Sequence, residues 1–435
     1  MISRKHNKIN IITLGCAKNL VDSEVLVRQL NVSGFEVLHN ADPVESGTVI
    51  INTCGFIKEA KEESLDTIMQ YVNARKSNLI DNLYVIGCLS ERYMHELKVE
   101  IPEVDRYFGV NDLPKILKEL GGRYLEELTG ERILSTPPHY AYMKVSEGCD
   151  RKCSFCAIPL IRGKQKSKSL EKLHAEAQYL SSLGVKELIL IAQDLTAYGT
   201  DLYGEQKLVR LLENLVAVNG ISWIRLHYAY PAGFPEGLTE MIRDNPVICN
   251  YLDIPFQHIS DKVLEKMHRG INRAEILFLI DRIRKTVPDI SIRTTLLTGH
   301  PGEGENEFSE LIQFIQDQKF ERLGVFKYSE EEGTFAAKYF KDAIPTRVKE
   351  ERFKNIMEIQ KDLSLKANDA KVGRKIQVLI DRWEGDYAVG RTEADSPEID
   401  NEVLVLDRNK KFKAGEFFKV QITDAREYDL FGEIV

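Results

Sequence analysis

The stretch that decides the fold is Ser146–Gly163, SEGCDRKCSFCAIPLIRG, which places three cysteines in a C-x3-C-x2-C spacing. These are Cys149, Cys153 and Cys156, and an aromatic residue, Phe155, precedes the last of them. A [4Fe-4S] cluster takes four donors, usually cysteines, so three thiolates leave one iron free to bind another molecule. The alternative is a structural zinc site, but such a site needs four closed ligands, and no fourth Cys or His lies near the loop.

Length and composition are those of an ordinary globular protein. The 435 residues predict two or three domains. No stretch reaches the eighteen or so apolar residues of a membrane span. Seven cysteines without a disulfide framework are typical of a reducing compartment, so we expect a cytoplasmic protein with no membrane partner. The net charge of −8 argues against general nucleic-acid binding, which requires an excess of Lys and Arg.

The first segment, Ile9–Tyr124, alternates short β-branched runs with stretches of helical spacing. Such alternation predicts βαβ units and an open parallel α/β sheet. Three of the runs end in a cysteine, at Cys16, Cys54 and Cys88. Because the carboxyl ends of parallel strands meet at one edge of a sheet, these thiols form a second candidate set of metal ligands. A lone cysteine is more often a small core residue, and we expect Cys249, in PVICNYLDI, to be one.

The central part of the chain, after Pro137 and Pro138, contains six strand-like runs, most of them separated by helical stretches. The runs are Tyr142–Val145, Glu187–Ile191, Trp223–His227, Tyr251–Ile254, Ser291–Leu297 and Leu323–Phe326. They predict a partial parallel (β/α)6 barrel, in which catalytic groups lie on the loops after the strands. We expect Gln193 and Tyr198 at this rim, binding a cofactor or substrate. A residue such as His258 in IPFQHIS is, taken alone, more often a capping or turn group.

From Lys371 onward the pattern changes to alternating apolar and polar residues between short turns. Short alternating strands predict a small antiparallel β-barrel. Over Lys371–Val435, eleven Lys and Arg stand against fourteen Asp and Glu, which is a net charge of −3. An acidic barrel is poorly suited to phosphates and better suited to a basic protein.

The cysteine triplet with its aromatic resembles the signature of the radical S-adenosylmethionine (SAM) superfamily. The resemblance implies that Cys149, Cys153 and Cys156 hold a [4Fe-4S] cluster whose free iron binds SAM. It further implies that an electron from this cluster splits SAM to a 5′-deoxyadenosyl radical, and that a low-potential electron donor is a partner. In such enzymes the cofactor carries the hard chemistry and the protein positions it.

A more specific resemblance extends along nearly the whole chain, to the methylthiotransferases, which are radical SAM enzymes with a second [4Fe-4S] cluster. It implies that Cys16, Cys54 and Cys88 hold this auxiliary cluster, where sulfur is delivered. The stretches that carry it in the first segment are GCAKNLVDSE from Gly15, INTCGFIKEAKEES from Ile51 and GCLSERY from Gly87. The last segment resembles the TRAM domain that ends these enzymes.

The resemblance also implies three domains. Residues 8–125 correspond to the domain of the auxiliary cluster, residues 135–370 to the radical SAM barrel, and residues 371–435 to a TRAM-like domain that binds the substrate. No side chain is assigned a catalytic role beyond the six cysteines, which act as cluster ligands.

The central loops resemble one branch of this family, which methylthiolates the β-carbon of an aspartate in a small-subunit ribosomal protein homologous to bacterial protein twelve. The implied partner is that protein, free or in the ribosome, and tRNA is not expected. The matching stretches are QDLTAYG, HYAYPAGFP, YLDIPFQH and VFKYSEEEGTFAA. Two departures stand out. Ala17 takes the place of a frequent Pro, and GHPGEG, with His300 and Gly304, replaces the more usual GFPGET.

Two other functions stay open on the sequence alone. A tRNA adenosine methylthiotransferase of the MiaB-like branch would share both clusters, although that branch usually has QNV-x-x-YG and LPVQSGS in two of the loops. A non-catalytic iron–sulfur or zinc scaffold that binds ribosomal components is the second alternative.

Overall fold

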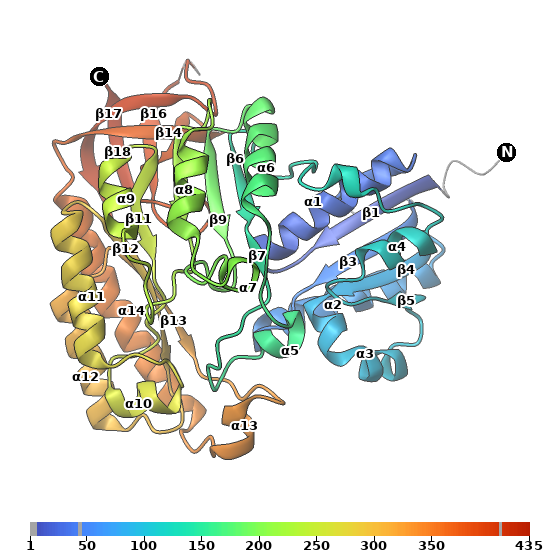
Figure 1. The fold of residues 1–435 in the computed structure, drawn as a ribbon, viewed down its shortest axis with the longest axis horizontal. Coiled ribbons are helices and arrows are strands. Elements are labelled where there is room, and N and C mark those ends of the chain that lie inside the picture. Colours follow the sequence, from blue (N-terminus) through green and yellow to red (C-terminus); the bar gives the residue numbers. More distant parts are fainter. Residues whose placement is uncertain (1–6, 42–45, 409–410) are drawn as a thin grey trace. The chain divides into compact units, whose positions relative to one another are not determined.

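The structure is a computed structural model that describes residues 7–41, 46–408 and 411–435. It divides into two compact units (Figure 1). The first unit comprises Met1–Thr136, Tyr142–Asp150 and Ala157–Tyr179, and the second comprises Pro137–Ala141, Arg151–Cys156 and Leu180–Val435. Among the described residues, none of the helices has both the length and the apolar character needed to cross a bilayer.

The first unit is built on a five-stranded sheet with the strand order β2-β1-β3-β4-β5, in which every neighbouring pair is parallel. This is the open α/β sheet that the alternating pattern predicted. Its strands and helices are β1 (Lys8–Thr13), α1 (Ala17–Val32), β2 (Glu36–His39), β3 (Ser46–Thr53), α2 (Lys58–Lys76), β4 (Ile80–Gly87), α3 (Cys88–Glu100), β5 (Arg106–Tyr107), α4 (Leu113–Glu119) and the short 3-10 helix η2 (Glu126–Leu128).

Both faces of this sheet are covered by helices. Alternate residues of β3 point to opposite faces, so Val49 and Ile51 join one core cluster while Ile50 joins the other. Ile68 of α2 packs in the first cluster and Leu26 of α1 in the second. A parallel sheet buried on both faces requires continuous apolar strands, and each fully buried side chain of this size contributes roughly 1.5–3 kcal/mol.

The first unit also contains the two ends of the cysteine stretch. The short strands β7 (Ser146–Glu147) and β8 (Lys166–Ser167) pair antiparallel, and helix α5 (Ile158–Arg162) lies between them in the chain. Helix α6 (Leu170–Ser182) follows and continues into the second unit.

A six-stranded sheet has the order β6-β9-β10-β11-β12-β13. Its strands β9 to β13 belong to the second unit and pair in parallel. The chain order of the strands is also their order in the sheet, as in the predicted partial barrel. The strands are β6 (Tyr140–Lys144), β9 (Glu187–Ile191), β10 (Trp223–Leu226), β11 (Ile248–Asp253), β12 (Ser291–Thr298) and β13 (Arg322–Lys327).

Helices connect these strands and lie alongside the sheet, from green to orange in Figure 1. Residues 273–286 illustrate how they begin, because Asn272 and Glu275 form a reciprocal capping box that satisfies two free backbone N–H groups. The helices are α7 (Thr200–Tyr203), α8 (Leu208–Val216), α9 (Leu238–Asp244), α10 (Asp261–Lys266), α11 (Arg273–Thr286), α12 (Glu305–Gln318), α13 (Phe335–Tyr339) and α14 (Thr346–Asp369).

The last segment forms a closed five-stranded barrel with the order β14-β15-β16-β18-β17. Most pairs are antiparallel, as predicted, but β16 and β18 run parallel and close the barrel. The strands are β14 (Lys375–Glu384), β15 (Tyr387–Arg391), β16 (Glu402–Leu406), β17 (Phe417–Ala425) and β18 (Asp429–Ile434).

Buried ion pairs join this barrel to the six-stranded sheet. Glu187 of β9 accepts from Arg225 at 2.7 Å and pairs with Arg391 of β15 at 2.8 Å. Cys249 lies in the apolar cluster at the same junction, together with Tyr251. Burial raises the pKa of the Cys249 thiol to about 12. The expectation that Cys249 is a packing residue is confirmed.

Candidate active site

The cysteine triplet lies on the segment that follows β6, the first strand of the six-stranded sheet. All three sulfur-bearing residues are partly exposed. The Cys149 amide donates to the Gly163 carbonyl oxygen at 3.1 Å, and the Cys156 amide donates to the Cys153 carbonyl oxygen at 3.2 Å. Gly148 has a φ of +74°, and a Cβ there would lie 2.1 Å from the Lys164 carbonyl oxygen, so only glycine fits.

The part of the loop between Cys153 and Cys156 is anchored through Ser154. Its amide donates to the Met267 carbonyl oxygen at 3.0 Å, and its carbonyl accepts from the Ala336 amide at 2.7 Å. Met267 directly follows α10 and Ala336 lies in α13, so the segments after β11 and β13 hold the cysteine loop. Phe155, the aromatic of the motif, makes an edge contact with His300, with ring centroids 6.1 Å apart.

The Cys153 sulfur is contacted by the polar side chains of Arg269 and Tyr230. The Arg269 Nη1 donates to it at 3.3 Å, and the Tyr230 hydroxyl oxygen lies 3.5 Å away. Two guanidinium groups lie over the Tyr230 ring, that of Arg151 at 4.1 Å and that of Arg269 at 4.2 Å from its centroid. Arg151 Nε also donates to a carboxylate oxygen of Asp194 at 2.6 Å. Burial raises the pKa of the Tyr230 phenol, so its hydroxyl stays neutral.

The remaining rim residues lie deeper than expected for groups that meet a substrate. Gln193 follows β9 and is partly buried, whereas the Tyr198 side chain is fully buried. Their assignment to SAM or substrate binding stays a prediction. His258 is fully buried, accepts from the Ser260 amide at 3.0 Å, and lies 3.3 Å from Glu303. This is the turn role that the sequence left open for it.

His300 and Gly304, the two departures in GHPGEG, have structural roles. His300 is fully buried, and burial lowers its pKa to about 4, so the ring is neutral. Gly304 begins helix α12, where its amide donates to the Glu307 carboxylate at 2.7 Å.

Cys16, Cys54 and Cys88 lie at the carboxyl ends of β1, β3 and β4, as the sequence predicted for three strands of one sheet. A Cβ at Gly15, whose φ is +87°, would lie 2.7 Å from the Cys54 Cβ, so glycine lets the loop of Cys16 approach Cys54. Burial raises the pKa of Cys54, and it raises that of Cys88 to about 11. Charge on one thiol raises the pKa of its neighbours, which places the three within electrostatic reach.

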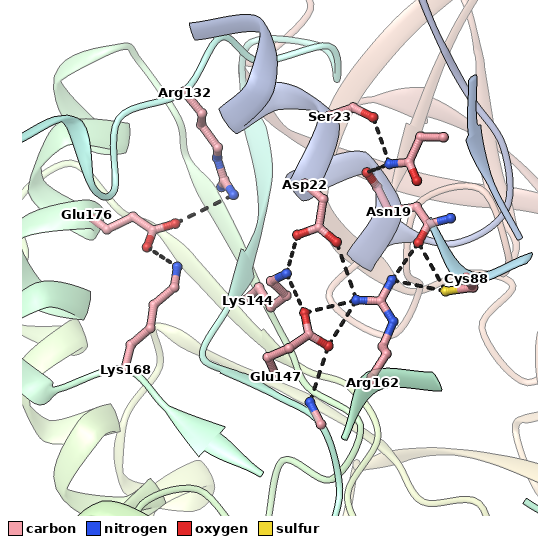
Figure 2. A network of polar contacts seen from close by, with 12 residues as sticks. Asn19, Asp22, Ser23, Cys88, Arg132, Lys144, Glu147, Arg162, Lys168 and Glu176 are labelled. Atoms are coloured by element: carbon pink, nitrogen blue, oxygen red, sulfur yellow. Dashed lines mark hydrogen bonds and ion pairs between the residues drawn. The ribbon is translucent and has the colours of Figure 1, made fainter. Parts of the chain in front are cut away.

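Arg162 contacts this second set of cysteines and comes from the end of the first motif. Figure 2 shows the contacts that its guanidinium makes. Nη2 donates to Asn19 Oδ1 at 2.6 Å and to Cys88 Sγ at 3.3 Å. Nη1 donates to both carboxylate oxygens of Glu147 at 2.9 Å and to Asp22 at 3.3 Å.

Lys144 completes this network. It donates to Glu147 at 2.7 Å and also pairs with Asp22 (Figure 2). Burial alone would raise the pKa of Glu147, but the charges of Lys144 and Arg162 outweigh burial and hold it at about 2. Two cations and two carboxylates therefore compensate one another around the Cys88 sulfur.

The donor chemistry of both sets fits iron–sulfur clusters. Within the described ranges, no three His, Cys, Asp or Glu side chains are arranged to hold a single metal ion. Cluster thiolates bind different irons and so stand farther apart than ligands of one ion. Two sets of three cysteines, each with an arginine N–H on one sulfur, match the thiolate ligation and sulfur hydrogen bonding of such clusters.

Arg269 is the main residue that sequence reasoning missed. It stands in MHRGIN, between α10 and α11, and no motif or spacing marks it. Tyr230 was part of a quoted rim loop, HYAYPAGFP, but its contact with Cys153 is a tertiary feature.

Three family models match the chain. They are the uncharacterized protein family UPF0004 over residues 8–109, the Radical SAM superfamily over residues 143–315 and the TRAM domain over residues 372–435. Among solved structures, the radical S-adenosylmethionine methyltransferase TsrM from Kitasatospora setae matches with a TM-score of 0.56 at 14% identity, over 73% of this chain and 72% of that chain. This likeness bears on the fold alone.

Curated relatives match over the full length. "Ribosomal protein uS12 methylthiotransferase RimO" of Bacteroides thetaiotaomicron is 50% identical over 431 residues, 99% of each chain. The protein of the same name from Flavobacterium johnsoniae is 53% identical over 432 residues, again 99% of each chain.

Fold, cysteine loop and family models together define a radical SAM enzyme of the methylthiotransferase type. The sequence identity of 50% and more to curated relatives over the full length then defines the family within this class. The chain belongs to the RimO family of ribosomal protein uS12 methylthiotransferases. The predicted family and its protein-modifying branch are confirmed, and the tRNA-modifying alternative is not favoured.

Proposed function

We propose that the chain transfers a methylthio group to the β-carbon of an aspartate in ribosomal protein uS12. The observation that carries this proposal is the 50–53% identity to curated uS12 methylthiotransferases over 99% of both chains. Cys149, Cys153 and Cys156 would hold the [4Fe-4S] cluster that binds SAM, and the other three strand-end cysteines would hold an auxiliary [4Fe-4S] cluster. When bound, these groups supply the electron, the methylthio group and the radical that acts on an unactivated carbon.

The residues around the cysteine loop position its thiols. The backbone of Ser154 is held by Met267 and Ala336, which restricts the motion of Cys153 and Cys156. The Tyr230 ring contacts two guanidinium groups beside the loop. Such fixed, partly buried surroundings limit water at the reacting centre.

We also propose how the substrate and other partners meet the enzyme. Ribosomal protein uS12, free or in the ribosome, would dock on the TRAM-like domain, residues 371–435, whose net charge of −3 suits a basic protein. Residues 8–125 and 135–370 would form the auxiliary-cluster and radical SAM domains. A low-potential electron donor would reduce the clusters, and the reaction would take place in the cytoplasm.

Mass spectrometry after anaerobic reconstitution tests this function. The protein is incubated with SAM, a reductant and two rival substrates, a peptide from the uS12 aspartate loop and an unmodified tRNA. We expect one methylthio group on the peptide aspartate and an unmodified tRNA. A modified adenosine with an unmodified peptide would overturn the protein-modifying assignment, and a protein that holds no iron would overturn the enzyme assignment.

A further inference from the structure

Arg269 is a buried cation beside the cysteine loop, with only 4% of its surface exposed. Its Nη1 donates to the Cys153 sulfur at 3.3 Å and its Nη2 donates to the Pro255 carbonyl oxygen at 2.5 Å. The guanidinium also lies 4.2 Å from the Tyr230 ring centroid, and its own carbonyl accepts from the Tyr230 hydroxyl at 2.8 Å. The side chain is therefore held in one place against the sulfur.

No carboxylate compensates this charge within the part of the chain that the structure describes. Arg269 forms no ion pair there, and its buried Nε has no acceptor. Arg151, whose guanidinium also lies over the Tyr230 ring, differs because it is paired with the buried Asp194. The net charge beside the Cys153 sulfur is thus positive.

An isolated buried cation is costly unless an anion or a set of hydrogen bonds offsets it. One carbonyl and one aromatic face offset only part of that cost, since a cation–π contact is worth about 0.5–2 kcal/mol. The unsatisfied Nε–H and the contact to a thiol both point to an anionic group at Cys153. A cluster ligated by thiolates is such a group.

We propose that Arg269 raises the reduction potential of the cluster held by Cys149, Cys153 and Cys156. This inference rests on the proposed function, which assigns a cluster to these residues. Reduction adds one negative charge to the cluster, and a buried positive charge with an N–H on a ligand sulfur stabilises that reduced state. Hydrogen bonds to the sulfurs and net charge are among the features that set such potentials. Arg269 is thus a positioning and tuning residue for the cluster.

The test is a redox titration of this cluster alone. The full chain carries Cys16→Ala, Cys54→Ala and Cys88→Ala, so only one cluster remains, and SAM is left out. After anaerobic reconstitution, electron paramagnetic resonance measures the reduced fraction at set potentials. The parent is compared with Arg269→Gln, which removes the charge but keeps an N–H donor, and with Arg269→Lys, which keeps the charge but loses the forked geometry.

We expect Arg269→Gln to lower the ratio of reduced to oxidised cluster at least tenfold at a given potential, a shift of about 59 mV for one electron. Arg269→Lys should give a smaller shift in the same direction. The matched control is Arg273→Gln, which removes an arginine four residues further along, whose side chain is 44% exposed. It should leave the potential unchanged. Iron content and circular dichroism check that each variant is folded and loaded.

An unchanged potential in Arg269→Gln would overturn the inference, as would an equal shift in Arg273→Gln. If Arg269→Gln fails to hold the cluster, Arg269→Lys decides. Because it keeps the charge, a potential above the parent's, or one lowered by the full shift of about 59 mV, contradicts the tuning role. The titration uses neither uS12 nor any product. If Arg269→Gln shows the shift but the chain with all six cluster cysteines intact does not methylthiolate the uS12 peptide, only the proposed function is refuted.

Discussion

Among the residues that the structure describes, two arginines donate a hydrogen bond to a cysteine sulfur at 3.3 Å, and their surroundings differ in charge. Arg162, at Cys88, also binds two carboxylates and shares them with a lysine. Arg269, at Cys153, has a carbonyl, an aromatic ring and no carboxylate among the described residues. An arginine whose charge is compensated by carboxylates holds the surrounding segments together. An arginine without such carboxylates attracts an anion that binds beside it.

This difference assigns separate tasks to the two cysteine sets. The neutral network at Cys88 joins Asn19 and Asp22, from the helix after β1, to the flanks of the cysteine motif, Glu147 and Arg162 (Figure 2). Its role is to hold loops together. The surroundings of Cys153 are instead positively charged and so favour a negatively charged group. Such surroundings suit a cluster that must accept an electron.

The largest expected effect separates the two sets directly. Cys153→Ala should abolish SAM cleavage, whereas Cys54→Ala should spare cleavage and stop methylthiolation, because only the first set would bind SAM. Liquid chromatography measures 5′-deoxyadenosine, and mass spectrometry measures the modified uS12 peptide. Cys249→Ala, at a buried packing position, is the matched control and should retain both activities. Unchanged product from either of the first two variants would contradict the scheme.

The second prediction concerns stability. Arg162→Gln should lower the free energy of unfolding of the cluster-free protein by about 3–5 kcal/mol, because it leaves Glu147 and Asp22 with Lys144 alone. Denaturant unfolding followed by circular dichroism measures the loss in the transition of this unit.

Two further variants complete that test. Arg269→Gln should cost less, since no carboxylate loses its partner there. Arg210→Gln, whose side chain is 64% exposed, should change stability by less than about 0.5 kcal/mol. If Arg162→Gln and Arg269→Gln cost the same, the contrast between compensated and uncompensated charge is wrong.

Local sequence patterns predicted the fold and the position of both cysteine sets. Short continuous apolar runs mark these strands because both faces of a parallel sheet are buried, and Cys16, Cys54 and Cys88 each follow such a run. The partners of Arg162 were not predictable, because Asp22 lies 140 residues away and meets it only in the folded chain. Arg269 carries no local signal at all. The parallel pairing of β16 and β18 is likewise non-local.

The third prediction uses pH to sharpen the comparison. Burial lowers the pKa of His300, near the Cys153 loop, to about 4 from 6.5. Between these values the unfolded chain binds a proton that the native chain does not, so the free energy of unfolding falls as pH drops from 6.5 to 4, by up to about 3 kcal/mol. The pKa of Glu147 is lowered to about 2, so the stability that its ionised carboxylate contributes is lost only as pH falls below about 4.5.

Denaturant unfolding of the cluster-free protein at several pH values measures this slope. His300→Phe, which restores the residue that the family more often has, should flatten the part of the slope between pH 6.5 and 4. Replacing the exposed His95 by Gln should leave the slope as it is. If the free energy of unfolding of His300→Phe still falls as steeply between pH 6.5 and 4, another group controls the acid sensitivity.

The smallest expected effect comes from removing a carboxylate partner of Arg162, so that its charge is less compensated and its surroundings resemble those of Arg269. Asp22→Asn removes one compensating carboxylate, so the network at Cys88 gains net positive charge. In the proposed auxiliary cluster, the ratio of reduced to oxidised form at a given potential should then rise a few-fold. The change should be smaller than the tenfold expected at Arg269, because Asp22 is 28% exposed and water screens its charge. The titration uses a chain with Cys149→Ala, Cys153→Ala and Cys156→Ala. Asp22→Glu, which keeps the charge, should match the parent, and a potential that is the same in Asp22→Asn would mean that compensation does not govern this cluster.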